Sequence, residues 1–183
     1  MFDKIKFNLA HFIIRKKYLL KTNTPLSFNN ILSDSTKFLL IMPNNNDEFT
    51  ESLLLINYLL ENKKFVTLFI HESKLNMIPK SGTLVMKNRN LVVLTFVDEN
   101  RNRLNLPVNL FAKSLKSKEY DVVMDLNRSC DLFLTSIANI VKSRVKVGFE
   151  QEKTGDFYDI RIVNFHQDPA QIYSNYINFL KMF

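Results

Sequence analysis

The chain has 183 residues, 46% of them apolar, and a formal net charge of +7. This length suits one domain with a single core and is too short for two domains of ordinary size. One cysteine excludes an internal disulfide and a Cys-rich zinc site, and no uncharged apolar run approaches the roughly 20 residues of a membrane span. We therefore expect a cytoplasmic protein, and the many Asn, Lys, Ile and Phe residues beside three glycines indicate an AT-rich bacterial genome.

The first 36 residues are predicted to form a basic amphipathic helix, over about twenty residues, and a linker. Apolar residues recur there at a three-to-four spacing, and Met1–Lys21 holds six Lys or Arg residues against Asp3 alone. Docking on the chain's own domain or on a dimer partner is the commonest role of such a helix, and an anionic membrane surface is the alternative. The residues expected to contact a membrane or partner are Lys4, Phe12, Arg15, Lys16 and Lys17, with Phe2, Phe7 and Tyr18 as further aromatic residues.

Nucleic-acid binding is not expected from this basic segment. Charge alone can attract a phosphate backbone, but no recognisable RNA- or DNA-binding motif accompanies it anywhere in the sequence. The remaining partner classes are an unidentified protein partner, a second copy of the chain and an anionic membrane.

From residue 37 onward, strands and helices are predicted to alternate. Apolar runs rich in β-branched residues predict strands at Lys37–Met42, Phe65–Ile70 and Leu91–Val97. Helices are predicted at Asp47–Asn62 and from Pro107, a residue favoured in the first turn of a helix, to about Lys118.

The segment 120–150 predicts a strand, a helix and a second strand. Tyr120–Leu126 is a near-continuous apolar run, typical of a strand that is covered on both faces. Ser129 is the predicted helix cap, Lys142–Arg144 is predicted to close the helix, and Val145–Phe149 is the second strand. The unit has the length of a right-handed crossover, roughly 30 residues, so the two strands are expected to be parallel.

The remaining residues predict a strand at Tyr158–Val163 and a last helix from Pro169 to Met182. The whole pattern predicts an α/β fold with three layers: a mostly parallel, Rossmann-like sheet of about six strands between helices, preceded by the amphipathic helix. Residues 37–183 are expected to form one domain.

In such sheets, ligands bind beyond the carboxyl ends of the strands, where polar residues follow each predicted strand. For any single residue, a role in turning the chain or capping a helix is favoured over a role in binding. The ligand-binding candidates at these positions are Asn46, Asp47, His71, Asp125, Asn127 and Arg128.

The sequence does not favour three other kinds of site. The loop Pro43–Asp47 has no glycine, so an NAD or ATP phosphate cradle is not expected there, and no cofactor is predicted. Cys130, with His71 and Asp98 on neighbouring strand ends, would suit a cysteine hydrolase, but a buried structural cysteine is favoured. His11 and His166 lack metal-ligand spacing, so no metal is expected.

Three stretches resemble the N-terminal, acceptor-side domain of the heptosyltransferases, glycosyltransferase family 9 enzymes of the two-domain GT-B architecture. They are FLLIMPNNNDEFTESLL from Phe38, YDVVMDLNRS from Tyr120 and VKSRVKVGFEQEKTG from Val141. The resemblance implies that Asp47 matches a catalytic base. Asn46 stands where the family has glycine, and no proline follows around Ser52–Leu53.

In GT-B enzymes a C-terminal domain mainly holds the nucleotide-sugar donor, and we expect such a domain to be absent, as in a short bacterial family of stand-alone glycosyltransferase-like domains. The leading hypothesis is a non-catalytic binding or interaction domain without catalytic residues. One alternative is the acceptor-binding half of a hexosyl- or heptosyl-transferase, completed by a separate donor-binding subunit, with Asp47 as base. Another is a peripheral envelope-biogenesis protein at the inner membrane.

Overall fold

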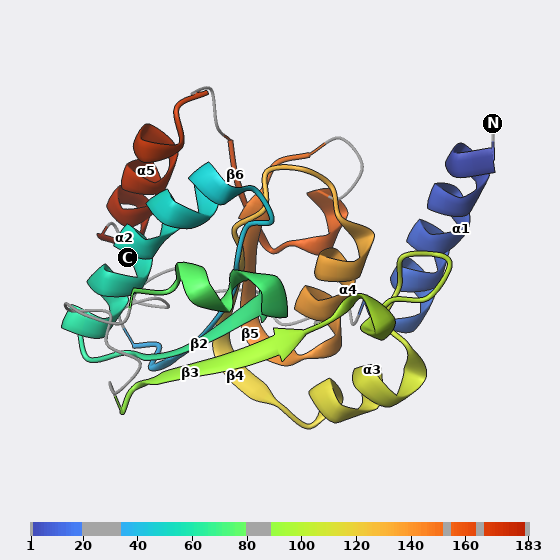
Figure 1. Cartoon of the computed structure of the whole chain (residues 1–183), viewed down its shortest axis with the longest axis horizontal. Helices are drawn as coiled ribbons and strands as arrows, with labels where there is room; N and C mark the ends of the chain where they lie inside the picture. The colour runs from blue at the N-terminus through green and yellow to red at the C-terminus, as the bar shows by residue number, and fades with distance from the viewer. Residues whose placement is uncertain (1, 20–33, 80–88, 152–154, 164–166, 182–183) are drawn as a thin grey trace.

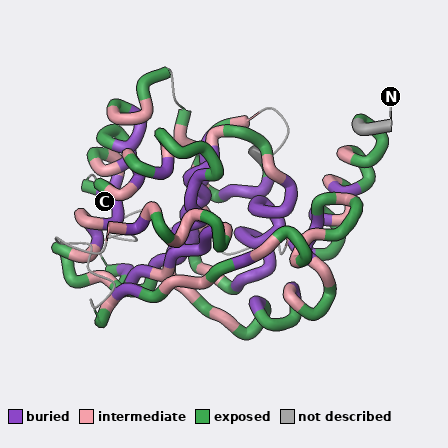
Figure 2. Tube along the Cα trace, viewed as in Figure 1, coloured by how far each residue is buried: buried purple, intermediate pink, exposed green. Residues whose placement is uncertain are grey.

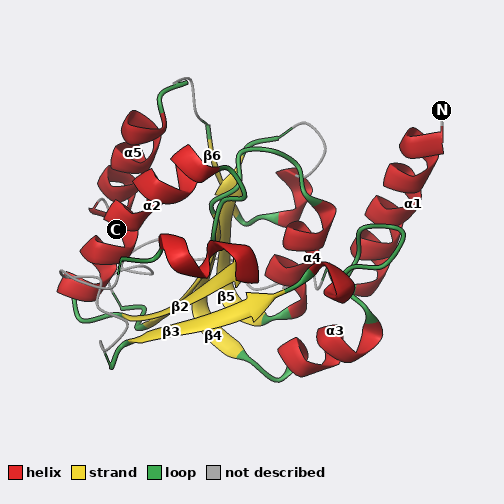
Figure 3. Cartoon of the chain, in the orientation of Figure 1, coloured by secondary structure: helices red, strands yellow, loops and turns green. Residues whose placement is uncertain are grey.

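The computed structural model describes residues 2–19, 34–79, 89–151, 155–163 and 167–181. Within this part of the chain the centre is a six-stranded sheet in the order β3-β2-β1-β4-β5-β6, and each neighbouring pair is parallel (Figure 3). The strands are β1 Lys37–Ile41, β2 Phe65–His71, β3 Leu91–Phe96, β4 Glu119–Asp125, β5 Lys142–Phe149 and β6 Ile160–Ile162. The predicted Rossmann-like α/β fold is confirmed, and the sheet is fully parallel where the prediction was mostly parallel.

Helices cover both faces of the sheet (Figure 1). One face carries α2 and α5, and the other carries α3 and α4, with α1 outside them. The helices are α1 Phe2–Lys17, α2 Asn46–Glu61, α3 Asn109–Lys116, α4 Leu132–Ile140 and α5 Pro169–Lys181, with short 3-10 turns η1 Glu72–Met77, η2 Asp98–Asn100 and η3 Gly155–Phe157. The predicted linker, residues 21–36, lies largely outside the described residues.

Helix α4 is enclosed on all sides. All nine of its residues are buried, because the sheet covers one side and α1 covers part of the other (Figure 2). Its sequence, LFLTSIANI, is apolar around most of its circumference, which is typical of a buried helix. Helix α1 docks on it through Ala10 and Ile14, which are fully buried, so the helix predicted from the first residues is an extra layer on this domain.

Several predicted boundaries are wrong. Asp131, two residues after the predicted cap Ser129, caps α4, and Lys142–Arg144 belongs to β5 because Val141 already has an extended backbone. Helix α3 begins at Asn109, since Pro107 pairs with Arg101 in an isolated bridge.

The predicted strand from Tyr158 begins two residues later, at Ile160 in β6. The side chain of Tyr158 instead reaches under the sheet edge, and its hydroxyl donates to Asp125 at 2.6 Å. Its ring lies over Gly148 of β5, where an added Cβ would come within 2.7 Å of the ring carbons. This contact fixes the segment between β5 and β6 against the end of β4.

Candidate functional site

The strands β1 and β4 are neighbours whose connections leave toward opposite sides, so their carboxyl ends form the topological switch point of the sheet. Asn127 occupies this point and is 4% exposed. Its Oδ1 accepts a hydrogen bond from the backbone N–H of Asn44 at 3.1 Å. Its Nδ2 donates to Asp125 Oδ1 at 2.8 Å and to the carbonyl of Met42 at 3.3 Å. The side chain therefore ties the two strand ends together.

Asp125, the last residue of β4, is also enclosed, with 3% of its surface exposed. Its Oδ1 accepts from the backbone N–H of Asn127 at 3.1 Å as well as from the Asn127 amide, and its Oδ2 accepts from the Tyr158 hydroxyl. Burial raises the pKa of the Asp125 carboxyl above its ordinary value, although these hydrogen bonds act in the opposite direction. Asp125 thus joins β4 to the segment before β6.

We expect Asp125→Asn to remove a pH dependence of folding stability. Because the pKa of Asp125 is raised in the folded chain, the native state binds more protons than the unfolded chain, whose carboxyl titrates near 3.8. The stability that Asp125 contributes is therefore fully present below that pH and is lost as the pH rises through its folded pKa. Urea unfolding should be measured from below pH 3.8 upward. As the pH rises, the free energy of unfolding of the wild type should fall relative to that of Asp125→Asn. A difference that stays constant, or that changes in the opposite direction, would contradict the assignment.

Asp131, which is not among the residues predicted to bind a ligand, is the centre of a second network. Its Oδ1 caps α4 by accepting from the N–H groups of Phe133 at 2.9 Å and Leu134 at 3.3 Å. Its Oδ2 pairs with Arg101 Nη1 at 2.9 Å, and both side chains are largely buried. Asn44 Nδ2 and Asn105 Nδ2 also donate to the carboxylate, each at 3.2 Å. The sequence does place an Asp directly before an apolar run, which predicts a helix cap but not the contacts with Arg101, Asn44 and Asn105.

Arg101 brings the segment after β3 across the sheet edge to this network. Its guanidinium lies 4.4 Å from the ring centre of Phe133 and 5.2 Å from that of Phe96, so it is held between aromatic faces. Its Nη1 also donates to Asn105 Oδ1 at 2.9 Å, and Asn105 has a left-handed backbone with φ 55. The loops after β1, β3 and β4 are thereby joined through Asp131.

The start of α2 carries the candidates Asn46 and Asp47, both exposed. The cap is the preceding residue, Asn45, whose side-chain oxygen accepts from the N–H groups of Asp47 at 2.9 Å and Glu48 at 3.1 Å. Lys74 Nζ donates to the side-chain oxygen of Asn46. The helix N-terminus is therefore satisfied by its own cap.

Arg128, which is half-buried, contacts the first turn of α2. Its Nη1 donates to Glu48 Oε1 at 3.4 Å and to the carbonyl of Gln167 at 3.3 Å. Burial raises the pKa of the Glu48 carboxyl, while the Arg128 charge lowers it. The pair joins the loop after β4 to α2 and to the residues before α5.

His71 and Asp98 meet at the β2 and β3 ends, as the sequence suggested, with Nε2 and Oδ1 3.6 Å apart. The His71 Nδ1 faces the Ser73 hydroxyl at 2.7 Å. Cys130 was expected to be buried, and this is wrong: it is exposed, in the loop directly before the Asp131 cap. Strand β1 lies between β2 and β4, which puts the strands of His71 and Cys130 about 10 Å apart. At this separation of the two strands, Cys130 and His71 do not form a catalytic pair.

Besides Asn46 and Asp47 at the start of α2, the carboxyl edge thus holds three separate groups of candidates. Asp125 and Asn127 are buried and bonded to each other, Arg128 pairs with Glu48, and His71 pairs with Asp98. Among the described residues, no cluster of three or more His, Cys, Asp or Glu side chains is arranged to hold a metal ion.

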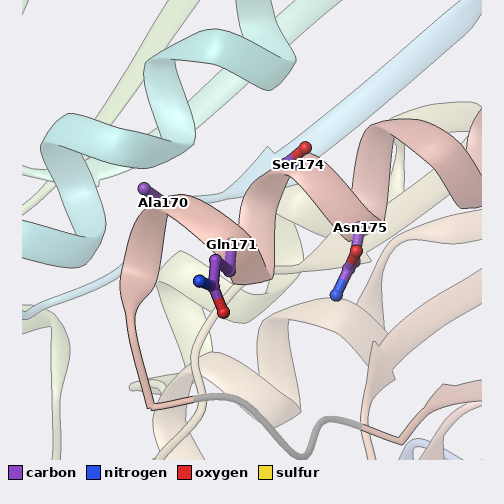
Figure 4. A pocket seen from close by; sticks show the side chains of 4 residues that line it. All are labelled: Ala170, Gln171, Ser174 and Asn175. Carbon is purple, nitrogen blue, oxygen red and sulfur yellow. The ribbon is translucent and has the colours of Figure 1, made fainter.

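The described residues also line two hollows. One lies beside α5 and is lined by Ala170, Gln171, Ser174 and Asn175, which carry no charge (Figure 4). The other is lined by Lys17, Tyr18, Lys116, Asn139, Ile140 and Lys142, where α1, α3 and α4 end. Neither hollow includes a residue predicted to bind ligand at the carboxyl edge.

Some of the residues predicted to contact a membrane or partner instead contact the rest of the chain, and others are exposed. Arg15 Nη2 pairs with Asp156 at 3.3 Å, and Lys17 Nζ donates to Asn109 at 3.4 Å, so both help to attach α1. Tyr18, expected to be available to a membrane or partner, is instead buried, because it packs in the core beneath α1. Phe12 is 56% exposed and faces outward. Lys4 and Lys16 are also exposed.

The fold is similar to that of solved glycosyltransferases. A family 9 glycosyltransferase of Veillonella parvula superposes with a TM-score of 0.58 at 14% identity, covering 79% of this chain and 41% of that chain. The heptosyltransferase WaaC of Escherichia coli, with ADP-2-deoxy-2-fluoro heptose, gives a TM-score of 0.50 at 13% identity and coverages of 77% and 48%. The chain therefore spans less than half the length of these proteins. No protein-family model matches the sequence, and no curated protein matches it significantly.

These similarities confirm the heptosyltransferase-like GT-B fold that the three sequence stretches indicated. At identities this low, they establish the fold alone.

Proposed function

We propose that the chain is a glycosyltransferase-like domain that works as a binding or interaction module and does not catalyse transfer by itself. The observation that carries this proposal is that hydrogen bonds within the chain occupy the switch point. In α/β sheets, ligands bind at this position. Asn127 and Asp131 join the strand ends and loops there by hydrogen bonds within the chain. A ligand entering between β1 and β4 would have to break these bonds.

The position of Asp47 also favours a role without catalysis. A general base acts on a substrate hydroxyl that is held within hydrogen-bond reach and shielded from water. Asp47 is exposed in the first turn of α2, where a carboxylate is stabilised by the helix dipole. The presence of an acidic residue at position 47 is therefore explained by its stabilising effect on the start of α2.

The start of α2 is poorly suited to a phosphate group. Anions bind helix N-termini through free backbone N–H groups. Here the Asn45 side chain already accepts from the N–H groups of Asp47 and Glu48, and those two side chains add negative charge. This supports the prediction that no nucleotide cofactor binds at this loop.

A polar surface remains on the exposed side of the edge. Donors and acceptors lie at or just beyond the ends of β1, β2 and β3, on Asn46, His71, Lys74 and Asp98. Arg128 adds a half-buried cation beyond β4. Such a mixture suits saccharide hydroxyls or the polar rim of a protein partner. We assign the binding role to this surface, in a cytoplasmic protein of bacterial origin.

The alternative function is the acceptor-binding half of a heptosyltransferase-type enzyme that needs a separate donor-binding subunit. The fold similarity to WaaC and the place of Asp47 after β1 favour it. The two functions predict different results for Asp47→Asn, with Glu51→Gln, one helical turn further along α2, as the matched control. If the proposed function is correct, the purified chain transfers no saccharide, and neither Asp47→Asn nor Glu51→Gln changes that result. In the alternative, a reconstituted complex transfers saccharide, and Asp47→Asn alone abolishes it.

A further inference from the structure

The outward face of α1 carries an apolar stripe. Ile5, Leu9 and Phe12 are 60%, 48% and 56% exposed, and their spacing of four and three residues puts them on one side of the helix. The opposite side, through Ala10 and Ile14, is buried against the domain. Helix α1 is the outermost layer on its side of the molecule, so the stripe faces away from the sheet (Figures 1 and 2).

Cationic residues flank this stripe on both sides. At 3.6 residues per turn, Lys4 and Arg15 fall on one side of the stripe and Lys6 and Lys17 on the other. Lys16 lies along the stripe, and its Nζ is 5.9 Å from the centre of the Phe12 ring. A lysine whose stem covers an aromatic ring can keep its ammonium group in a polar layer while the ring enters an apolar one.

The pattern of charge selects among occupants. A second copy of α1 packed on the stripe would bring the flanking cations of two chains together, which is unfavourable. A nucleic acid would match the cations but would face an apolar stripe where its phosphates lie. A membrane with anionic lipids matches both features, because apolar side chains enter the acyl boundary and lysines meet the headgroups.

We propose that α1 lies in the surface of an anionic membrane and holds the domain there. The helix is attached through its buried face and through the Arg15–Asp156 pair, so binding of α1 would carry the whole domain. Lys116 and Lys142, which line one hollow with Lys17 at the end of α1, add positive charge nearby. No helix among the described residues is long and apolar enough to cross a bilayer, and the proposal needs only a helix lying in its plane.

This inference does not depend on the function proposed for the carboxyl edge, and it is tested with vesicles. The full chain should cosediment with vesicles of phosphatidylcholine and phosphatidylglycerol, and much less with phosphatidylcholine alone, and added salt should weaken the binding. The triple variant Ile5→Ser, Leu9→Ser, Phe12→Ser should lose binding. Leu54→Ser is the matched control, since Leu54 is 47% exposed on α2, on the far face of the sheet, and it should bind as wild type does.

A second variant tests the charges without altering the stripe. Lys4→Gln with Lys6→Gln should weaken binding to the anionic vesicles by about fivefold for each lysine removed. Circular dichroism of each variant checks that it remains folded. Because these side chains are exposed, the substitutions leave the core intact.

Three results would overturn the proposal. The first is a wild-type chain that does not bind anionic vesicles. The second is equal binding by wild type and the triple variant, which would put the contact elsewhere. The third is a wild-type dimer in sedimentation equilibrium that the triple variant converts to monomer, without vesicle binding by either, which would make the stripe a contact between copies.

Discussion

Asp131→Ala is expected to lower the free energy of unfolding by about 3–5 kcal/mol, the usual cost of leaving a buried charge without its partner. The Arg101 guanidinium would remain between Phe96 and Phe133 with its carboxylate partner removed. The same change removes the α4 cap, a loss that by itself costs about 1 kcal/mol. Urea unfolding monitored by circular dichroism measures the difference.

Asp131→Asn separates these two contributions. Asparagine is also a good helix cap, so this variant should recover the capping share, about 1 kcal/mol, and not the share from the ion pair. A loss below about 1 kcal/mol for Asp131→Ala would contradict the claim that Asp131 joins the loops at the switch point.

Gly148→Ala is expected to cost about 1–3 kcal/mol, because it adds a methyl group to a filled core. The new Cβ would meet Cγ and Cδ2 of Tyr158 at 2.7 Å. The ring cannot move away easily, since Tyr158 is 7% exposed and its hydroxyl is bonded to Asp125. Urea unfolding of the variant measures the cost.

A double-mutant cycle with Tyr158→Leu checks the cause. Without the ring, Gly148→Ala should lose most of its cost, because the clashing atoms are gone. An equal cost in both backgrounds would contradict the assignment of the cost to the Tyr158 ring.

The fold was largely predictable because its central strands, β1 and β4, are buried over most of their length. Continuous apolar runs such as Tyr120–Leu126 mark strands without ambiguity, and crossover lengths make them parallel. The starts of helices were less certain. Ser129 and Asp131 are both good caps, and the choice between them is made by Arg101 and Asn105, about 30 residues earlier in the chain.

The orientation of α1 could not be read from its sequence either. Apolar residues lie on two sides of this helix, and periodicity alone does not say which side docks. Contacts with α4 and with the rest of that core bury Ala10, Ile14 and Tyr18 and leave Ile5, Leu9 and Phe12 outside.

The sequence predicts where the candidate residues lie along the sheet edge, but not how deeply each of them is buried. Polar residues after parallel strands meet at one edge, so Asp125, Asn127 and His71 were found there as expected. Burial of Asp125 depends on Tyr158, which lies 33 residues further along the chain and gave no local signal. The difference between a polar edge and an open binding site is set by such distant contacts.

Incubation of the purified chain with ADP-heptose and a saccharide acceptor, followed by mass spectrometry of the acceptor, tests the central claim most directly. We predict no transfer above the background without protein, and the same result for wild type and Asp47→Asn. Transfer by the wild-type chain alone that Asp47→Asn removes, and that Glu51→Gln leaves unchanged, would contradict it.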